Sequence, residues 1–320
     1  MTLSDDATRR QQKSDLQDWI RQERRAAIIV NTQSRQGENL YAEAVRLLSE
    51  AGLRLDPQYP IGDASRVPEV VAHALAQGHR FVIVGGGDGT ISSVVDQFAY
   101  KDVAFGLLPL GTANSFARTL SIPLDLSGAV EVLTTGKVVD IDLGQIDGDY
   151  FANAASIGLP ATIARARPHL LKKVLGRAGY LVVAGARLAT FKPFRCTVAF
   201  GGGWSKAFDA VVEIRVANGP YKGGLLVADE ADLESRKLVL HIVKGGSRRR
   251  LAAVWAKFAA GIRPKSSELE SFTAASFVIS TDPKQYVSID GEAVAQTPIQ
   301  VNVAKQALRI VVPLDRADLS

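Results

Sequence analysis

The sequence is poor in cysteine and in long apolar runs. Cys196 is the only cysteine among the 320 residues, so the chain can form no internal disulfide and has no cysteine cluster for a metal. The most apolar stretch, AGYLVVAGA at 178–186, lies between two arginines and is far shorter than the roughly 20 apolar residues that span a bilayer. Residues 1–24 lack the apolar core of a signal peptide and are predicted as a polar tail. These absences predict a cytoplasmic protein that meets a membrane only peripherally, at its inner face.

Several motifs of well-known enzyme classes are also missing. The four histidines are scattered, with no metal-ligand spacing and no Ser-His-Asp grouping. No segment fits GxxxxGK[ST], and the run GGGDGT at 85–90 fails as GxGxxG because Thr90 or Ser92 takes the place of the third glycine. The sequence therefore excludes a P-loop enzyme and disfavours a dinucleotide dehydrogenase.

The composition and the order of strand and helix patterns predict two domains. With 47% apolar and 22% charged residues, the chain is globular and can bury a large core. From 25 to 137, short β-rich runs alternate with helical patterns, which is typical of an α/β domain with a parallel sheet. From 138 to 320, alternating strands favour an antiparallel β-sandwich, interrupted by helical patterns around 162–190 and 248–260. We expect a ligand cleft between the two domains, and the last strand either stays in the second domain or returns to the first.

The net charge of +5 is unevenly distributed, because no acid occurs between Asp149 and Asp209 or from Ser235 to Ser267. Such basic runs are typical of a solvated surface, and equally of a surface that attracts an anionic membrane or a phosphate-bearing substrate. Both interpretations stay open. A nucleic-acid partner is disfavoured, since there is no nucleic-acid motif and the basic runs are not interleaved with aromatic residues. The basic residues of the two runs are Arg165, Arg167, Lys172, Lys173, Arg177, Arg187, Lys192, Arg195 and Lys206, and Arg236, Lys237, Lys244, Arg248, Arg249, Arg250, Lys257, Arg263 and Lys265.

A glycine-rich loop follows the predicted strand RFVIV. The glycines around Asp88, at 85, 86, 87 and 89, allow positive φ and remove side chains, so the backbone can fold closely around phosphate oxygens. Asp88 itself repels bare phosphate and needs Mg²⁺ or a substrate hydroxyl as its neighbour. Thr90 is predicted to cap the next helix or to donate to a phosphate. The alternative is a tight turn in which Asp88 only caps that helix.

A second loop and a distant turn add to this pattern. LPLGTANSFAR at 108–118 repeats the sequence of strand, Gly-Thr turn and helix, with Asn114 as a cap or polar contact. Because the ends of neighbouring parallel strands share one edge of a sheet, the two loops are expected to face a common crevice. DGE at 290–292 is either an Asp-Gly hairpin turn without further function or the source of a carboxylate that deprotonates an alcohol during phosphoryl transfer.

Five motifs now stand in one order: GGDGT at 86–90, LPLGTANSFAR, SIGL at 156–159, NGPYKGG at 218–224 and DGE at 290–292. Over residues 26 to 313 they resemble the diacylglycerol kinase catalytic-domain family of soluble lipid kinases, which includes bacterial lipid kinases and sphingosine kinases. The resemblance implies a nucleotide-binding α/β domain at 25–137, a β-rich lipid-substrate domain at 138–320, and ATP and Mg²⁺ as cofactors. The implied substrate is a lipid alcohol, diacylglycerol-like or sphingoid.

The resemblance also assigns residues by position. It makes Asp88 a partner of the metal or of the hydroxyl, and Glu292 the catalytic base, whereas the metal ligands and the oligomeric state stay unassigned. The residues that it places around the nucleotide are Asn31, Ser34, Gly86, Gly87, Asp88, Gly89, Thr90, Gly111, Thr112 and Asn114.

Three departures from the family pattern stand out. The Asn-Pro-x-Ser-Gly turn after the first strand is here NTQSR at 31–35, without its proline and glycine. The Asn-Asp pair of bacterial members is Asn114-Ser115, and the Asp-Gly pair before the strand at 238, which helps to hold a structural Mg²⁺, is Ser235-Arg236. They leave open a nucleotide- or lipid-binding module without catalysis. A kinase of a soluble substrate is a second alternative, because NAD kinases and phosphofructokinases also carry Gly-Gly-Asp-Gly. The second loop argues against an NAD kinase, because it lacks the Asn-Glu signature of NAD kinases.

Overall fold

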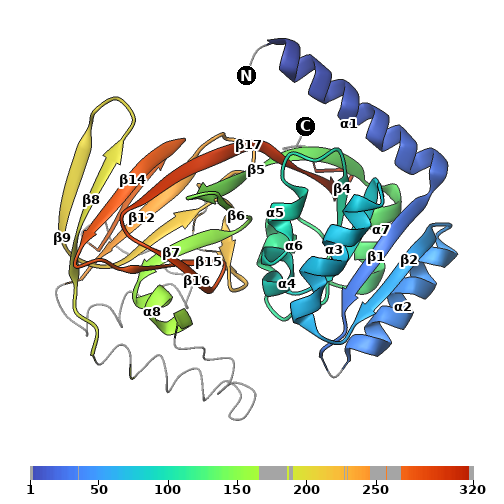
Figure 1. Ribbon diagram of the computed structural model, residues 1–320, viewed down its shortest axis with the longest axis horizontal. Helices are drawn as coiled ribbons and strands as arrows, with labels where there is room; N and C mark the ends of the chain where they lie inside the picture. Colours follow the sequence, from blue (N-terminus) through green and yellow to red (C-terminus); the bar gives the residue numbers. More distant parts are fainter. Residues whose placement is uncertain are drawn as a thin grey trace. The chain divides into compact units, whose positions relative to one another are not determined.

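The computed structural model describes residues 3–34, 36–165, 186, 190–226, 228, 230–245, 257 and 268–316. Its contacts divide the chain into two compact units (Figure 1): unit 1 is Met1–Leu143 with Lys305–Ser320, and unit 2 is Gly144–Ala304. The division falls after Leu143 rather than at 137, because strand β5 (Lys137–Ile146) runs on without a break through both limits. Most of the helical patterns expected at 162–190 and 248–260 lie outside the described residues.

Unit 1 is built on five parallel strands in the order β2-β1-β3-β4-β17. β3 and β4 are buried along their whole length, which is typical of strands covered on both faces. The predicted α/β domain with a parallel sheet is therefore confirmed. Its strands are β1 (Arg25–Asn31), β2 (Arg54–Ile61), β3 (Phe81–Gly86), β4 (Ala104–Pro109) and the end of β17 (Ile299–Val312).

Short helices connect these strands, and local sequence sets their ends. Asp125 accepts a hydrogen bond from the N–H of Gly128 at 2.8 Å and so caps α7, while Pro68 occupies the first turn of α3, where no N–H partner is lost. The helices are α2 (Gly37–Glu50), α3 (Val67–Ala76), α4 (Asp88–Ser92), α5 (Val95–Phe98), α6 (Ser115–Thr119) and α7 (Leu126–Thr135).

The segment predicted as a polar tail is instead a helix, α1 (Leu3–Glu23), that packs on unit 1. Leu16 is fully buried and Ile20 nearly so. Gln17 donates to the carbonyl of Gly136 at 3.4 Å and accepts the N–H of Val138, so its amide satisfies backbone groups at the start of β5. Two apolar residues one turn apart in a polar stretch give too weak a pattern to predict such a helix.

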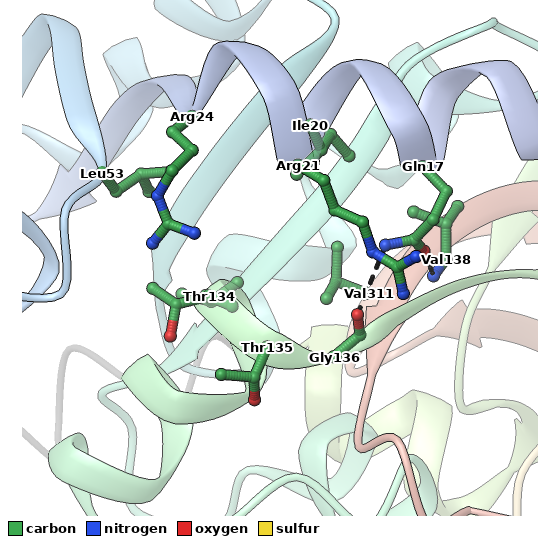
Figure 2. A pocket seen from close by; sticks show the side chains of 11 residues that line it. Gln17, Ile20, Arg21, Arg24, Leu53, Thr134, Thr135, Gly136, Val138 and Val311 are labelled. Atoms are coloured by element: carbon green, nitrogen blue, oxygen red, sulfur yellow. Dashed lines mark hydrogen bonds between the residues drawn. The ribbon is translucent and has the colours of Figure 1, made fainter.

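A small cavity of about 70 Å³ lies where α1 meets the end of α7. Figure 2 shows the side chains of Gln17 and Arg21 in α1, and of Arg24 just after it, extending toward Thr134, Thr135 and Gly136. The Arg24 guanidinium is already bonded to the carbonyls of Ala51 and Gly52, at the end of α2. Polar side chains at the cavity therefore serve to bond the free backbone carbonyls at helix ends of unit 1.

The last strand returns to the parallel sheet, the point that the sequence left open. β17 pairs with β4 in parallel, Ile310 opposite Phe105. Arg309 on β17 is 4% exposed and donates to Asp140 of β5 at 3.2 Å and to Asp102. A buried guanidinium with two carboxylates holds the returning strand in place.

Unit 2 is an antiparallel β domain, as predicted. The strand order is β16-β15-β7-β9-β8-β14-β17, with β12 joining β9 to β13 and β6 pairing with β5. The inward residues of these strands form one core that includes Phe151, Ile214, Leu240 and Phe277. Its elements are β6 (Asp149–Phe151), β7 (Ala154–Gly158), α8 (Leu159–Arg165), β8 (Phe194–Phe200), β9 (Ser205–Ala217), β10 (Tyr221–Lys222), β11 (Leu225–Leu226), β12 (Leu238–Lys244), β13 (Leu269–Ala274), β14 (Ser276–Asp282), β15 (Tyr286–Ile289) and β16 (Glu292–Gln296).

Candidate functional site

The two glycine loops of unit 1 touch through their backbones. β3 and β4 are neighbours in register, Gly86 opposite Pro109, so their following loops start side by side. A Cβ on Gly111 would lie 2.4 Å from the Cα of Gly87 and 2.7 Å from Asn114 Oδ1. Gly111 therefore cannot carry a side chain without moving the first loop, and a Cβ on Gly87 would lie only 3.1 Å from the Cα of Gly111.

The glycines of the first loop do not use the positive φ that glycine allows. Neither Gly85, Gly86, Gly87 nor Gly89 has a left-handed backbone, and Gly87 is extended at φ −94°, ψ −178°. The chain passes directly from β3 through Gly87 into α4, which needs no left-handed residue. Space is what the glycines provide: a Cβ on Gly86 would lie 2.6 Å from Thr90, whereas one on Gly89 would meet nothing within 4 Å.

Asp88 links the two loops. Its Oδ1 accepts the backbone N–H of Phe116 at 3.2 Å, in the first turn of α6. The carboxylate therefore caps the helix of the neighbouring loop and not its own helix, α4. The side chain is half-buried, and no described residue donates to Oδ2. One oxygen is thus fixed within unit 1, whereas Oδ2 has no protein donor in the described part of the chain.

Asn114 shapes the second loop from inside. It is 6% exposed and adopts φ 47°, a left-handed backbone that asparagine tolerates. Its Oδ1 accepts the N–H of Gly111 at 2.9 Å, and its Nδ2 donates to the carbonyls of Gly111 at 2.9 Å and Pro109 at 3.2 Å. Both Asn114 and the N–H of Gly111 are occupied within the loop, so they position it.

Asn31 ties the end of β1 to the first loop. Its Nδ2 donates to Thr90 Oγ1 at 2.9 Å, while its Oδ1 accepts the N–H of Gln33 at 3.1 Å. Thr90 lies inside α4 and does not cap it. The strand order reverses between β1 and β3, and at such a switch point ligands bind beyond the carboxyl ends of parallel strands.

Exposed groups at this edge could receive phosphates. Gly89, Gly111, Thr112 and Ser34 are exposed, and the N–H groups of Asp88 and Gly89 fall in the first turn of α4, where no helix carbonyl reaches them. Open space beside Gly89 leaves room for a phosphate. Among the described residues no group of three His, Cys, Asp or Glu side chains forms a metal site. A lone carboxylate suits Mg²⁺, which completes its shell with phosphate oxygens and water.

In unit 2 the DGE motif forms a tight turn. Asp290 and Gly291 have φ values of 45° and 102° and join β15 to β16 as a two-residue hairpin, Ile289 opposite Glu292. The Asp290 carboxylate accepts the N–H groups of Ala152 at 3.3 Å and Ala154 at 2.9 Å. Asp290 therefore anchors the turn, and Glu292 is the first residue of β16.

The NGPYKGG motif reaches the same backbone segment as Asp290, and SIGL lies farther along strand β7 of that segment. Asn218 of NGPYKGG, 1% exposed, donates through Nδ2 to the carbonyl of Ala152 at 3.1 Å. Gly158 of SIGL has φ 92°, and a Cβ there would lie 2.8 Å from the Phe194 ring. The structure thus gathers three distant motifs of unit 2 around residues 152–158. Sequence reasoning did not identify this positioning role of Asp290 and Asn218, for which the only signal is a polar residue next to glycine.

The departures in unit 2 have local explanations. Arg236, at the place of the family glycine, keeps a left-handed backbone with φ 56°. Ser235 Oγ donates to the carbonyl of Asp232 at 2.8 Å, so a hydroxyl closes a turn where a carboxylate was expected.

Two acids pair with members of the basic runs: Glu270 in β13 and Glu268 just before that strand. Glu270 pairs with Lys206 and with Lys244 at 3.0 Å, and Glu268 pairs with Lys257 at 2.6 Å. Hydrogen bonds from Lys206 and Lys244 hold the pKa of the Glu270 carboxyl below its usual value. No helix within the described part of the chain has the length and apolarity needed to cross a membrane.

Comparison with known proteins agrees with this architecture. Residues 25–146 match the diacylglycerol kinase catalytic domain, and residues 153–312 match the YegS C-terminal NAD kinase beta sandwich-like domain. The chain is 32% identical over 280 residues to "Probable lipid kinase YegS-like" of Klebsiella pneumoniae (strain 342), covering 85% of this chain and 91% of that protein. It is 30% identical over 298 residues to "Probable lipid kinase YegS" of Escherichia fergusonii, covering 90% and 96%.

A solved structure gives the same fold. The crystal structure of a diacylglycerol kinase from Bacillus anthracis str. Sterne matches with a TM-score of 0.68 at 22% identity, over 90% of this chain and 97% of that one. At this identity the likeness supports the fold alone.

Proposed function

Because the chain belongs to the diacylglycerol kinase catalytic-domain family, we propose that it is a lipid kinase that transfers the γ-phosphoryl group of ATP to the hydroxyl of a lipid alcohol. The acceptor is diacylglycerol-like or sphingoid. The enzyme acts from the cytoplasm at the inner face of the membrane.

The observation that carries the proposal is the position of Asp88. Two glycine loops in backbone contact hold it at the carboxyl edge of a parallel sheet, and among the described residues only one of its oxygens receives a hydrogen bond. This arrangement places a single negative group beside open space at Gly89. A carboxylate there favours a cation or a hydroxyl as its partner and disfavours bare phosphate.

The residues divide the work of phosphoryl transfer as follows. The backbone at Gly87–Thr90, with Ser34 and Thr112, receives the phosphates, while Asn31, Gly111 and Asn114 keep the loops in place. Mg²⁺, when bound, neutralises charge on the phosphates, and Asp88 is its protein ligand or orients the acceptor hydroxyl. Glu292 accepts the proton of the hydroxyl, from a turn that Asp290 anchors.

Asp88→Asn tests the proposal. The amide oxygen can still accept the N–H of Phe116, so the loops keep their contact while the negative charge is lost. We expect turnover to fall at least about 100-fold, the range usual for a lost acid–base or charge contact, with unchanged thermal unfolding. The assay uses labelled ATP, Mg²⁺ and a panel of lipid alcohols, followed by mass spectrometry of the products.

The same assay separates the alternatives. Phosphorylation of NAD in place of lipids would identify a kinase of a soluble substrate. NAD is included in the assay because residues 153–312 match an NAD kinase beta sandwich-like domain. ATP binding by the wild type without transfer to any lipid would identify a binding module. Glu292→Gln serves as a second variant, expected to lose turnover and to retain ATP binding.

A further inference from the structure

Unit 2 has an exposed aromatic side chain that the proposed chemistry does not use. Trp204 lies in the turn that joins β8 to β9 and is 51% exposed. The N–H of Phe200 donates to the carbonyl of Trp204 at 2.8 Å and closes the turn. In Figure 1 this yellow hairpin extends past the end of the neighbouring strand β14.

The Trp204 indole rests on a stack of rings that reaches the core. Its centroid lies 4.6 Å from that of Phe200 and 6.0 Å from that of Phe272. Phe200 in turn lies 6.1 Å from Phe277, which is 1% exposed. The indole is therefore held in one place although half of it faces solvent.

A cationic side chain, Lys206, lies beside the stack. Lys206 Nζ lies 5.4 Å from the Phe272 centroid and 5.5 Å from that of Phe208. One carboxylate, Glu270, is shared between Lys206 and Lys244, which leaves this cluster with a net positive charge. The rim beside Trp204 thus complements lipid phosphates.

The shape of the turn favours a lipid surface over a protein partner. Gly201, Gly202 and Gly203 are exposed and carry no side chain, so the indole is the only large group at the tip. A stable protein interface buries roughly 800 Å² on each side, which one side chain cannot supply. A tryptophan beside cationic residues is the combination that anchors proteins in the interfacial layer of a bilayer.

We propose that the β8–β9 turn docks unit 2 on a phospholipid surface, with the Trp204 indole in the interfacial layer and the lysines near the lipid phosphates. The inference rests on the proposed function, because docking on a bilayer would bring the enzyme to its lipid alcohol substrate. The docking itself is measurable without any turnover.

Vesicles of phosphatidylcholine and phosphatidylglycerol test the docking directly. In a Trp19→Phe/Trp255→Phe chain, Trp204 is the only tryptophan, and we expect its emission to shift to shorter wavelength and to be quenched by brominated lipid chains. Trp204→Ala is expected to weaken sedimentation with vesicles about tenfold or more, because apolar area is lost from the interface. Tyr100→Ala, which removes an aromatic residue of similar exposure (52%) in unit 1, is the matched control and leaves binding unchanged.

The idea is overturned if the chain sediments with vesicles while Trp204 emission stays constant, or if Trp204→Ala and Tyr100→Ala weaken binding equally. Trp204→Phe keeps the ring stack and guards against a folding defect, and we expect intermediate vesicle binding.

A second assay separates this inference from the proposed kinase. With a short-chain lipid alcohol in free solution, Trp204→Ala should match the wild type, whereas with lipid alcohol in vesicles it should be slower. Vesicle-dependent quenching of Trp204 without phosphorylation by the wild type would leave the docking supported and reject the kinase. Equal rates of Trp204→Ala and wild type on vesicles would reject the docking and leave the kinase supported.

Discussion

At the residue scale, the glycines of the two loops have different roles. Gly87 and Gly111 lie back to back, with no room for a Cβ on Gly111 and little for one on Gly87, while the space next to Gly89 is open. The first pair is required by the fold of unit 1. The fold does not require glycine at position 89, so the missing side chain there matters only if a ligand occupies the open space.

Gly111→Ala and Gly89→Ala separate these roles. Gly111→Ala forces the two loop backbones apart, and we expect a loss of about 1–3 kcal/mol in the free energy of unfolding, together with weaker ATP binding. Gly89→Ala is expected to keep or raise stability, since alanine favours helix at this position of α4, and to weaken ATP binding alone. Chemical denaturation and ATP titration of both variants measure the effects. Equal stability of the two variants would contradict the contact between the loops.

Much of this site was predictable from the sequence, because strand-loop-helix order places loops at one edge of a parallel sheet. The placement of Asp88 beside the second loop follows from that rule. The hydrogen bond from the Phe116 N–H to Asp88 and the inward direction of the Asn114 amide do not follow from that rule, because they depend on how the two loops meet after folding. Which property of the glycines the first loop uses was not predictable, because glycine in a sequence does not distinguish conformational freedom from a need for space.

At the element scale, α1 is part of unit 1 although the diacylglycerol kinase catalytic domain match begins only at residue 25. Its contacts are with the chain segments that pass between the units: Gln17 reaches the start of β5, and Gln12 accepts from Arg309 of β17 at 3.1 Å. Arg80 stacks over Trp19 at 5.6 Å. Polar side chains dominate this packing, which is why hydrophobic periodicity could not predict it.

Gln17→Ala tests whether α1 stabilises the start of β5. The variant removes the partners of the Val138 N–H and the Gly136 carbonyl, and we expect unfolding to become easier by about 1–3 kcal/mol. Gln22→Ala, on the exposed side of the same helix, is the control and should change little. Thermal unfolding of the two variants gives the comparison. If they behave alike, the Gln17 amide does not stabilise the start of β5.

At the scale of the whole molecule, two strands belong to both units. β17 pairs with β14 in unit 2 and with β4 in unit 1, and β5 pairs with β17 and with β6. When unit 1 unfolds, β17 loses its pairing with β4 and the buried bonds of Arg309. The same strand then supports β14 only through its other half. The two units are therefore expected to unfold in one cooperative step.

Cys196 reports on this cooperativity from inside unit 2. The thiol is buried in the core, and burial raises its pKa to about 12, so it should not react with a disulfide reagent at pH 8 until unit 2 opens. Leu108→Ala in β4, a fully buried position of unit 1, costs about 2–5 kcal/mol. If the units open together, this distant change should accelerate labelling of Cys196 by at least roughly 30-fold.

Leu226→Ala provides the control within unit 2, because that side chain is 53% exposed and its loss should leave the labelling rate unchanged. Labelling rates of the three chains under native conditions decide the question. A Leu108→Ala chain that loses helical circular dichroism on mild heating, while Cys196 stays protected, would show that each unit unfolds by itself. In that case the shared strands must separate at the limits Leu143/Gly144 and Ala304/Lys305, so that unfolding of unit 1 does not unfold unit 2.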